Sequence, residues 1–362
     1  MKRRNFLKTS ALSLGALSLT PNIVFAGEKS RKFKVVFDFD VKSDEKSFPL
    51  KLWNPLPYNA EYQKVKLLSY DGNYESNEIN TNNPYDATTL YTSWEKSEKK
   101  KLLRINMEIE TTQRSVDIAL LKKASAQNLP IPQSVKVFLE PTEHIPTDGK
   151  VKAKADEITK GLNDQFAKVE AIYDWICEHT FRDPEVLGCG IGDAGKMLET
   201  GYFGGKCTDI SSLFVAFLRA AGVPAREVFG IRLGKSNFSA KALGGADDKG
   251  FAKISGGQHC RVEYYIAGIG WVPSDPADVT KLILVEGLKY EDKRVQELKA
   301  RYLHSWEMNW VGFNWGRDFV LSPKPTQFPL NMLGYPYGEI DDEVLNYYAP
   351  KNFSYNFTSQ EI

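Results

Sequence analysis

The chain has few of the residues from which metal centres are usually built. Its 362 residues include only four histidines and four cysteines, and it contains neither a CxxC nor an HExxH motif. The four histidines are scattered along the sequence instead of being grouped at ligand spacing. The sequence therefore does not indicate a metal site.

The chain also lacks an excess of charge of either sign. Lysine and arginine total 47 and aspartate and glutamate total 46, so the formal net charge is +1. No basic patch stands out, and nucleic acid is not an expected partner. Hydrophobic residues make up 42% of the sequence and aromatic residues 12%, which is enough for packed cores in one to three domains.

No segment is apolar over the ~20 residues that a membrane-spanning helix needs. The N-terminus has a twin-arginine pattern at Arg3 and Arg4, a short apolar stretch over 11–19 and a small-residue cleavage site ending at Ala26. We therefore predict a twin-arginine signal peptide over residues 1–26. It implies a bacterial protein in the periplasm or elsewhere outside the cytoplasm, with no stable membrane insertion after cleavage.

The four cysteines are Cys177, Cys189, Cys207 and Cys260. An oxidising compartment would permit disulfides, and Cys177 and Cys189 are close enough in sequence to pair. Cargo of the twin-arginine route, however, is usually folded before export. The sequence leaves it open whether these two thiols form a bridge.

The first part of the predicted mature chain is rich in short alternating segments that indicate β-strands. The expected strands cover residues 33–41, 50–53, 65–70, 88–94, 102–110 and 112–118. Regular short strands separated by turn residues favour a β-sandwich-like N-terminal domain over 27–140. No cluster of catalytic residue types occurs there, so we expect a structural or substrate-presenting module.

A proline-containing linker over 129–146 leads into a region of mixed helices and strands. Helices are expected over 151–162 and 165–179, a strand over 226–233, and a long glycine-rich polar loop over 234–257. A hairpin over 259–276 follows, which places the second domain at 141–285. The remainder, 286–362, is helical at first and then aromatic; we expect it to pack on the core, with a wall of a substrate cleft as the alternative.

The segment 204–224 carries the most informative pattern in the chain. Its apolar residues recur at helical spacing from Ile210 onward, and Gly222 and Pro224 mark the end of the helix. Cys207 falls in the first turn, at the positive end of the helix dipole, where the pKa of a thiol is lowered. The helix alone is also compatible with a Cys207 that is simply a small buried residue.

The hairpin supplies the other groups that a thiol nucleophile needs. His259 begins the first strand and Asp275 ends the second, so the two side chains are expected side by side, with the imidazole between carboxylate and sulfur. Cys260 is beside His259 in sequence, but the alternation of the strand directs it to the core face. Cys207 is therefore the expected nucleophile.

Three segments resemble the transglutaminase-like superfamily. Residues 205–209, with 213–214 and 219–226, resemble its nucleophile segment. Residues 258–265 resemble its histidine strand and 270–276 its aspartate strand. The helix over 171–176 is similar to the one before the core of that family, and 53–57 is similar to part of the β-domain that precedes many bacterial members. One departure is Arg261, where many members have a tryptophan.

The resemblance implies an α+β protein with a papain-like core and a catalytic triad. Cys207 would be the nucleophile, His259 the base and then the acid, and Asp275 the residue that orients the histidine. The implied reaction is attack on an amide carbonyl to give a thioester. The Cys207 N–H would contribute to the oxyanion hole, with Tyr202 one candidate for a second donor, and neither calcium nor an organic cofactor is required.

Three functions are compatible with this triad. The favoured one is an exported cysteine peptidase or amidase that cleaves peptide or isopeptide bonds, for which cell-envelope peptides are one candidate substrate. The alternatives are a cross-linking protein-glutamine γ-glutamyltransferase and a non-catalytic binding module of the same fold. The sequence identifies neither the substrate nor the oligomeric state.

Overall fold

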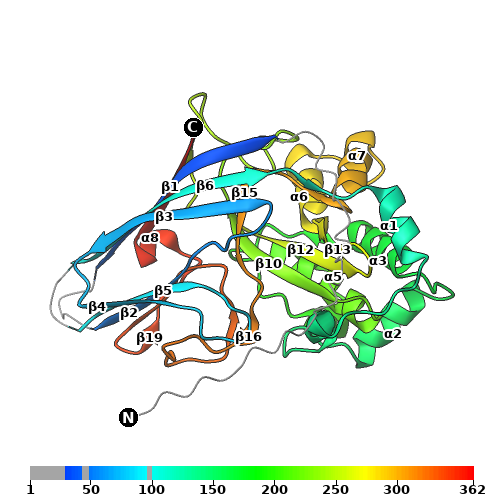
Figure 1. Cartoon of the computed structure of the whole chain (residues 1–362), viewed down its shortest axis with the longest axis horizontal. Coiled ribbons are helices and arrows are strands. Elements are labelled where there is room, and N and C mark those ends of the chain that lie inside the picture. The colour runs from blue at the N-terminus through cyan, green and yellow to red at the C-terminus, as the bar shows by residue number, and fades with distance from the viewer. Residues whose placement is uncertain (1–28, 43–48, 96–99) are drawn as a thin grey trace, which may run out of the picture.

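The computed structural model describes residues 29–42, 49–95 and 100–362 (Figure 1). The predicted signal peptide lies outside these residues. Within the described ranges, no helix is both long and apolar enough to cross a membrane. The chain combines helices and sheets and has a sheet-rich N-terminal region, as the sequence predicts.

A five-stranded antiparallel sheet forms one layer of the N-terminal half. Its strand order is β11-β20-β1-β6-β3. The bounds are β1 Ser30–Lys42, β3 Gln63–Gly72, β6 Lys100–Thr112, β11 Phe251–Lys253 and β20 Tyr355–Glu361. Every second residue of β1 is buried, from Phe33 to Val41, because alternate side chains of a strand point to opposite faces.

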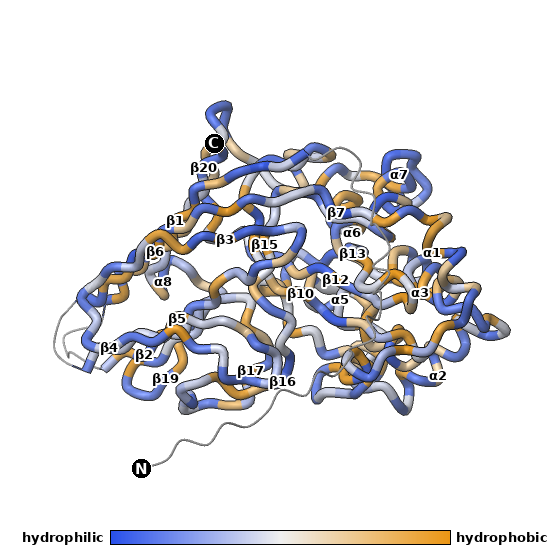
Figure 2. Tube along the Cα trace, in the orientation of Figure 1, coloured by the Kyte–Doolittle hydropathy of each residue, from blue (hydrophilic) through white to orange (hydrophobic). Residues whose placement is uncertain are grey.

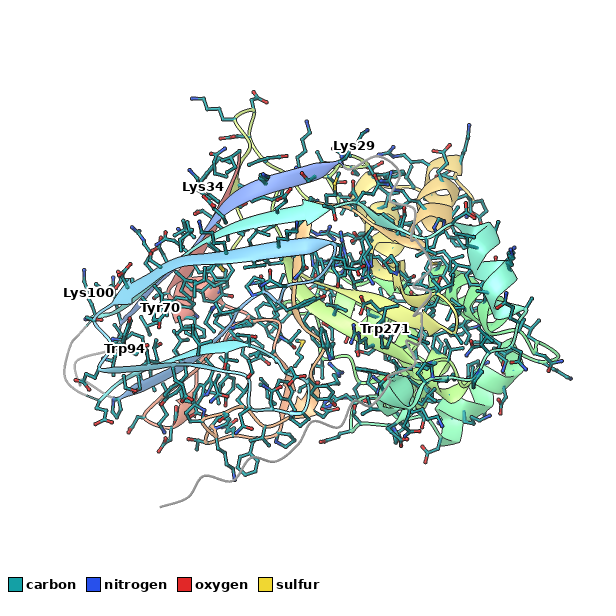
Figure 3. The ribbon with its side chains drawn as sticks, viewed as in Figure 1. Lys29, Lys34, Tyr70, Trp94, Lys100 and Trp271 are labelled. Carbon is teal, nitrogen blue, oxygen red and sulfur yellow. The ribbon has the colours of Figure 1, made fainter. Side chains whose placement is uncertain are left out.

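A second five-stranded sheet, in the order β19-β18-β2-β5-β4, lies opposite the first. Its strands are β2 Leu50–Pro55, β4 Ser76–Asn80, β5 Thr89–Trp94, β18 Tyr337–Ile340 and β19 Glu343–Val344. Side chains of both sheets, such as Phe37 and Leu52, belong to one apolar cluster. Figure 3 shows side chains filling the space between the layers. The result is the sandwich that the alternating pattern predicts.

The second half of the molecule has helices packed on a four-stranded antiparallel sheet, in the order β13-β12-β10-β15. The strands are β10 Ala225–Arg232, β12 Gln258–Ile266, β13 Gly270–Ser274 and β15 Trp310–Asn314. The principal helices are α2 Gly149–Ile158, α3 Gln165–His179, α5 Cys207–Ala220, α6 Pro276–Glu286 and α7 Lys293–Tyr302. Nearly every side chain of α5 is buried, because sheet and helices surround it; hydrophobic segments lie accordingly in the interior in Figure 2.

The remaining elements are short. They are β7 Arg114–Ser115, α1 Ile118–Ser125, η1 Gln133–Leu139, β8 Phe181–Arg182, α4 Ala194–Thr200, β9 Gly204–Gly205, β14 Ser305–Trp306, β16 Arg317–Phe319, β17 Leu330–Met332 and α8 Pro350–Phe353. Strand β8 runs parallel to β9, just before α5. This small pair holds the chain that leads into Cys207.

Two predicted elements differ in the structure. The strand expected over 112–118 is reduced to two residues, because Asp117 caps α1 by accepting hydrogen bonds from the N–H groups of Ala119 and Leu120. The long helical segment expected after residue 282 is two helices, since Gly287 adopts a left-handed conformation (φ 67°) that ends α6.

The last part of the chain belongs to both halves of the molecule. Strand β15 pairs with β10, whereas β18 pairs with β2 and β20 pairs with both β1 and β11. Residues 286–362 therefore contribute strands to each of the three larger sheets besides packing on the core. The domain boundaries at 140 and 285 stay a prediction.

Candidate active site

Helix α5 begins at Cys207, and its first turn is fixed by contacts with the preceding loop. The Asp209 carboxylate accepts hydrogen bonds from the N–H groups of Lys206 (2.8 Å) and Gly192 (2.8 Å). The N–H of Thr208 donates to the Cys189 carbonyl at 2.8 Å. The N–H of Cys207 lies in the first turn, where no carbonyl of the helix can accept from it. It is therefore free for a group bound at the helix start.

A cavity of about 160 Å³ lies at the start of α5; we call it the active-site cavity. It is lined by Arg182, Gly188, Cys189, Cys207, Arg232, Ser255, Gly256, Gly257, Gln258, His259, Lys281, Tyr335, Tyr348, Pro350 and Tyr355. Two of the three predicted site residues, Cys207 and His259, thus face one cavity. The cavity is smaller than the ~300–1,000 Å³ of drug-sized sites, so it suits one residue or group of a larger substrate.

Asp275 lies behind His259. The imidazole Nε2 of His259 is 2.8 Å from Oδ2 of Asp275, and both side chains are buried. Val262 pairs with Ser274 across the hairpin. The next residue after Ser274, Asp275, is therefore opposite Arg261. Its carboxylate contacts His259, which is two residues from Arg261 on the same face of β12. The other carboxylate oxygen of Asp275 accepts from the N–H of Asp278 and caps α6. Two hydrogen bonds therefore fix the carboxylate.

The strand that carries His259 is held on its other side by β10 and β15. Gly230 of β10 is opposite His259, and the indole of Trp310 donates from Nε1 to the His259 carbonyl at 2.8 Å. A Cβ at Gly230 would lie 2.4 Å from the Trp310 ring and 2.1 Å from the Val311 carbonyl oxygen. Only glycine allows this close approach.

Buried charges surround the histidine and its aspartate. Arg232 pairs with Asp278, and Nε of Arg261 lies 3.3 Å from Oδ2 of Asp275. Arg261 also lies over the ring of Trp310 at 4.8 Å from its centroid. The departure from the tryptophan of many relatives thus places a cation beside Asp275. His259, Asp275 and Asp278 hold donor atoms close enough to share a metal ion, but both carboxylates already face arginine.

The sulfur of Cys207 is close to two other thiols, Cys189 and Cys260. Hydrogen bonds from Cys189 and then from Cys260, together with His259, hold the pKa of Cys207 well below its ordinary value although burial opposes this. The pKa values of Cys189 and Cys260 are both raised. The S–H of Cys189 can point either to this sulfur or to the carbonyl of Gln258, 3.3 Å away. The directions of the three pKa shifts therefore favour a thiolate at Cys207 and neutral thiols at Cys189 and Cys260.

The imidazole of His259 is suited to carry a positive charge. Burial and the charge of Arg232 lower its pKa, but the charges of Asp275 and Asp278 outweigh them, so the pKa is raised. An imidazolium beside a thiolate is the resting state of activated cysteine nucleophiles. The neighbouring hydrogen bonds and charges thus outweigh burial and favour the charged form of both partners.

The side-chain amide of Gln258 is a feature that the sequence analysis missed. Gln258 lines the active-site cavity, and its Nε2 is buried without a hydrogen-bond partner among the described residues. A buried unpaired donor is costly and calls for a ligand or water. The signal available in the sequence was its position directly before His259. Tyr202, the candidate named from the sequence, is instead exposed, and its hydroxyl donates to Asp183 at 2.8 Å.

The aromatic residues of the C-terminal part form one side of the active-site cavity. Tyr335 donates to the sulfur of Cys189 at 3.0 Å, and Tyr348 donates to the carbonyl of Gly190 at 3.0 Å. These tyrosines pack on the core, as expected. They also line the cavity, which corresponds to the alternative expectation that this part of the chain forms a wall of a substrate cleft. All four cysteines are free thiols, so Cys177 and Cys189 are not bridged. Cys260 is buried in the core, as its place in the strand predicts.

Comparison with known proteins places this arrangement in a family. A sequence model of the transglutaminase-like superfamily matches residues 152–276. An uncharacterized protein of Haemophilus influenzae is 46% identical over 317 residues, covering 86% of each chain. The uncharacterized protein YebA of Bacillus subtilis is 29% identical over 132 residues, which are 35% of this chain and 17% of that protein.

One solved structure has a similar fold over most of the molecule. It is the crystal structure of a candidate cysteine protease from Cytophaga hutchinsonii, with a TM-score of 0.50 and 16% identity. The match covers 92% of this chain and 98% of that one, so the likeness includes the sandwich as well as the core. At this identity the comparison concerns the fold alone.

Proposed function

This chain belongs to the transglutaminase-like superfamily, and on that premise we propose that it is an exported cysteine hydrolase that cleaves peptide or isopeptide bonds. The observation that carries the proposal is the meeting of three groups at the active-site cavity. Cys207 lies at the start of α5, and the pKa of its thiol is lowered. His259 lines the same cavity, and its Nε2 is 2.8 Å from Oδ2 of Asp275, which lies on the far side of the imidazole. The three groups are those of an activated thiol nucleophile.

The chemistry assigns a role to each residue. Asp275 occupies Nε2 of His259, so Nδ1 is the nitrogen left for the sulfur. The Cys207 thiolate attacks the amide carbonyl, and the imidazolium gives its proton to the departing amine as the C–N bond breaks. Water then attacks the thioester and loses a proton to His259, and the C–S bond breaks to release the acid and restore the Cys207 thiolate beside the imidazolium. One amide and one water thus give one acid and one amine.

Two donors are suited to hold the developing oxyanion. The first is the N–H of Cys207, which no helix carbonyl can engage. The second is Nε2 of Gln258, which is buried and unpaired. A negative charge that develops between them would be stabilised by preorganised donors in a cavity with little water. Gln258 therefore replaces Tyr202 as the proposed second donor.

The proposed activity is tested with the mature protein, residues 27–362. Peptides and isopeptides are incubated with and without a primary amine, and the products are weighed by mass spectrometry. We expect hydrolysis products in both cases and none with Cys207→Ala. Amine adducts in place of hydrolysis would show a transferase instead. If neither product forms, and a thiol reagent labels Cys207 no faster than in the denatured chain, the protein is a non-catalytic binding module.

The extracytoplasmic location is part of the same proposal and is tested separately. Replacing Arg3 and Arg4 together by lysine removes the twin-arginine pattern. We expect the full-length variant to accumulate uncleaved in the cytoplasm of a bacterial host, whereas the unaltered chain is recovered outside it. Equal export of the two would remove the twin-arginine route.

A further inference from the structure

Two cationic side chains in the active-site cavity have no hydrogen-bond or ion-pair partner among the described residues. Arg182 comes from β8 and Lys281 from the second turn of α6, and both line the cavity beside Cys207. Arg232, the third cation of the lining, is different, because Asp278 pairs with it. The described part of the chain therefore leaves the charges of Arg182 and Lys281 without a direct partner.

The fold holds the two free cations close together. Helix α6 packs on β8 and on α5, which brings Lys281 towards Arg182 and the start of α5. Burial, and then the charges of Arg232 and Arg182, lower the pKa of Lys281 to about 8, while Asp278 and Cys207 act in the opposite sense. The two cations thus repel each other, and an anion between them would remove that repulsion.

The nearby acidic groups do not supply that anion. The Asp275 carboxylate is taken by His259 and Arg261, and Asp278 is taken by Arg232. Asp183, next to Arg182 in sequence, is half-buried and accepts from the Tyr202 hydroxyl. The start of α5 adds its own partial positive charge to the same cavity. The Cys207 thiolate also lies in this cavity, but His259 is its charged partner. A counter-charge for Arg182 and Lys281 would therefore come from a bound molecule.

We propose that Arg182 and Lys281 form a carboxylate subsite, so that the substrate is a peptide with a free carboxylate within about one residue of the scissile amide. The proposal rests on the function proposed above and names its substrate class. The size of the cavity limits the distance, since it has room for about one residue. Such a carboxylate is either the α-carboxylate of a chain end or an acidic side chain.

The first test does not depend on turnover. Iodoacetate and iodoacetamide both alkylate Cys207 by forming an S–C bond and releasing iodide, but only iodoacetate is an anion. Their rate constants at Cys207 are measured at pH 7 by mass spectrometry of its tryptic peptide. The ratio of the two rates cancels any change in the thiolate fraction, so it measures the preference of the cavity for an anion.

Arg182→Gln and Lys281→Gln should each lower the iodoacetate to iodoacetamide ratio about fivefold, since each removes one attractive charge. Lys293→Gln is the matched control, because Lys293 lies on α7 with a side chain 91% exposed, outside the cavity. Unchanged ratios in both cavity variants would overturn the subsite. A variant whose iodoacetamide labelling falls to the rate of the denatured chain has lost the folded site; it is replaced by Arg182→Lys or Lys281→Arg, which should keep the ratio.

The second test identifies the position of the carboxylate. Matched peptides that end in a free acid or an amide, and others with glutamate or glutamine beside the scissile bond, are compared by kcat/KM. We expect one member of a pair to be cleaved at least about tenfold faster by the unaltered chain, and the difference to shrink in Arg182→Gln. Equal cleavage of all pairs would overturn the subsite while leaving the hydrolase. If no peptide is cleaved but the iodoacetate to iodoacetamide ratio still falls in Arg182→Gln and Lys281→Gln, the hydrolase is rejected and the carboxylate subsite is kept.

Discussion

Strands β1 and β12 are both interior strands of an antiparallel sheet, but they bury different kinds of residue. In β1 the buried face is wholly apolar, from Phe33 to Val41, and the other face meets solvent. In β12 nearly every residue is buried, including His259, Arg261 and Glu263. Figure 3 marks the two halves with Trp94 in the sandwich and Trp271 beside β12.

The difference separates what holds the fold from what shapes the cavity. An apolar face gains stability from burial without any need for partners. A buried charge is costly unless it is paired, and the charges of β12 are paired with Asp275, Arg114 and Arg226. The desolvation of these charges offsets much of the stability that their pairing contributes. We therefore infer that the network serves mainly to fix the geometry and charge of the site. Four predictions, from the largest effect to the smallest, test this contrast.

The largest effect is expected at Cys207. Cys207→Ala should lower peptide hydrolysis by roughly 10³-fold or more, because no other thiol can take its place at the helix start. Cys177→Ala is the matched control: Cys177 is buried in α3, outside the active-site cavity. It should keep full activity and lose about 1 kcal/mol of stability. Thermal melts accompany both assays, and unfolding of the Cys207 variant would assign that residue to the core.

Asp275→Asn should follow, with a loss in kcat of roughly 10²- to 10⁴-fold. The asparagine can fill the same space, but it carries no charge to support the imidazolium, so the pKa of His259 should fall. The expected result is a normal KM, a reduced kcat and a changed acid limb of the pH profile. A variant with an unchanged kcat would remove Asp275 from the mechanism.

Glu263 and Phe37 distinguish the two halves by pH. Arg226 and Arg114 lower the pKa of Glu263 although burial opposes this. The stabilisation is therefore present above the unfolded pKa of about 4.3 and is lost as the pH falls through the folded pKa. Glu263→Gln should cost about 3–5 kcal/mol at pH 7, and this cost should shrink in acid.

Phe37→Ala should cost a similar 3–5 kcal/mol at every pH, since Phe37 stacks on Phe357 without any ionisable partner. Denaturant unfolding of both variants between pH 3 and pH 7 makes the comparison. A pH-dependent cost for Phe37→Ala, or a pH-independent one for Glu263→Gln, would contradict the distinction between the halves.

The smallest effect is expected at Cys189. Cys189→Ala removes the first of the thiol donors to Cys207, so the pKa of Cys207 should rise. Alkylation by iodoacetamide at neutral pH should slow by a few-fold, whereas the rates at alkaline pH should converge. Rates that stay equal to those of Cys177→Ala across the pH range would show that Cys189 does not tune the nucleophile.

Local pattern was enough to predict much of this fold. The stripe from Ile210 onward predicted α5, and alternation predicted β1 and the hairpin of β12 and β13, because burial of one face imposes a period on the sequence. The strand expected over 112–118 was wrong, since the capping chemistry of Asp117 acts locally and overrides a short alternation. Strand β4 was missed because its residues are mostly exposed.

The candidate site depends more on packing between distant segments. The sequence named Cys207, His259 and Asp275, and the structure brings them together; their catalytic roles stay a prediction. It did not indicate the contact of Cys189 with Cys207 or the free amide of Gln258. Each comes from a loop or strand placed by long-range contacts, which no local periodicity encodes.

The pairing of β20 with β1 has a consequence for the order of assembly. Phe33 pairs with Glu361, which the ribosome adds long after Phe33. The sandwich cannot close before β20 has been synthesised, and slow folding is expected where contacts are this far apart in sequence. Tyr335, Tyr348 and Tyr355, which line the cavity, are also made after Cys207 and His259. A nascent chain that already carries Cys207 and His259 therefore still lacks this side of the cavity, and the site is complete only after Tyr355 has been added.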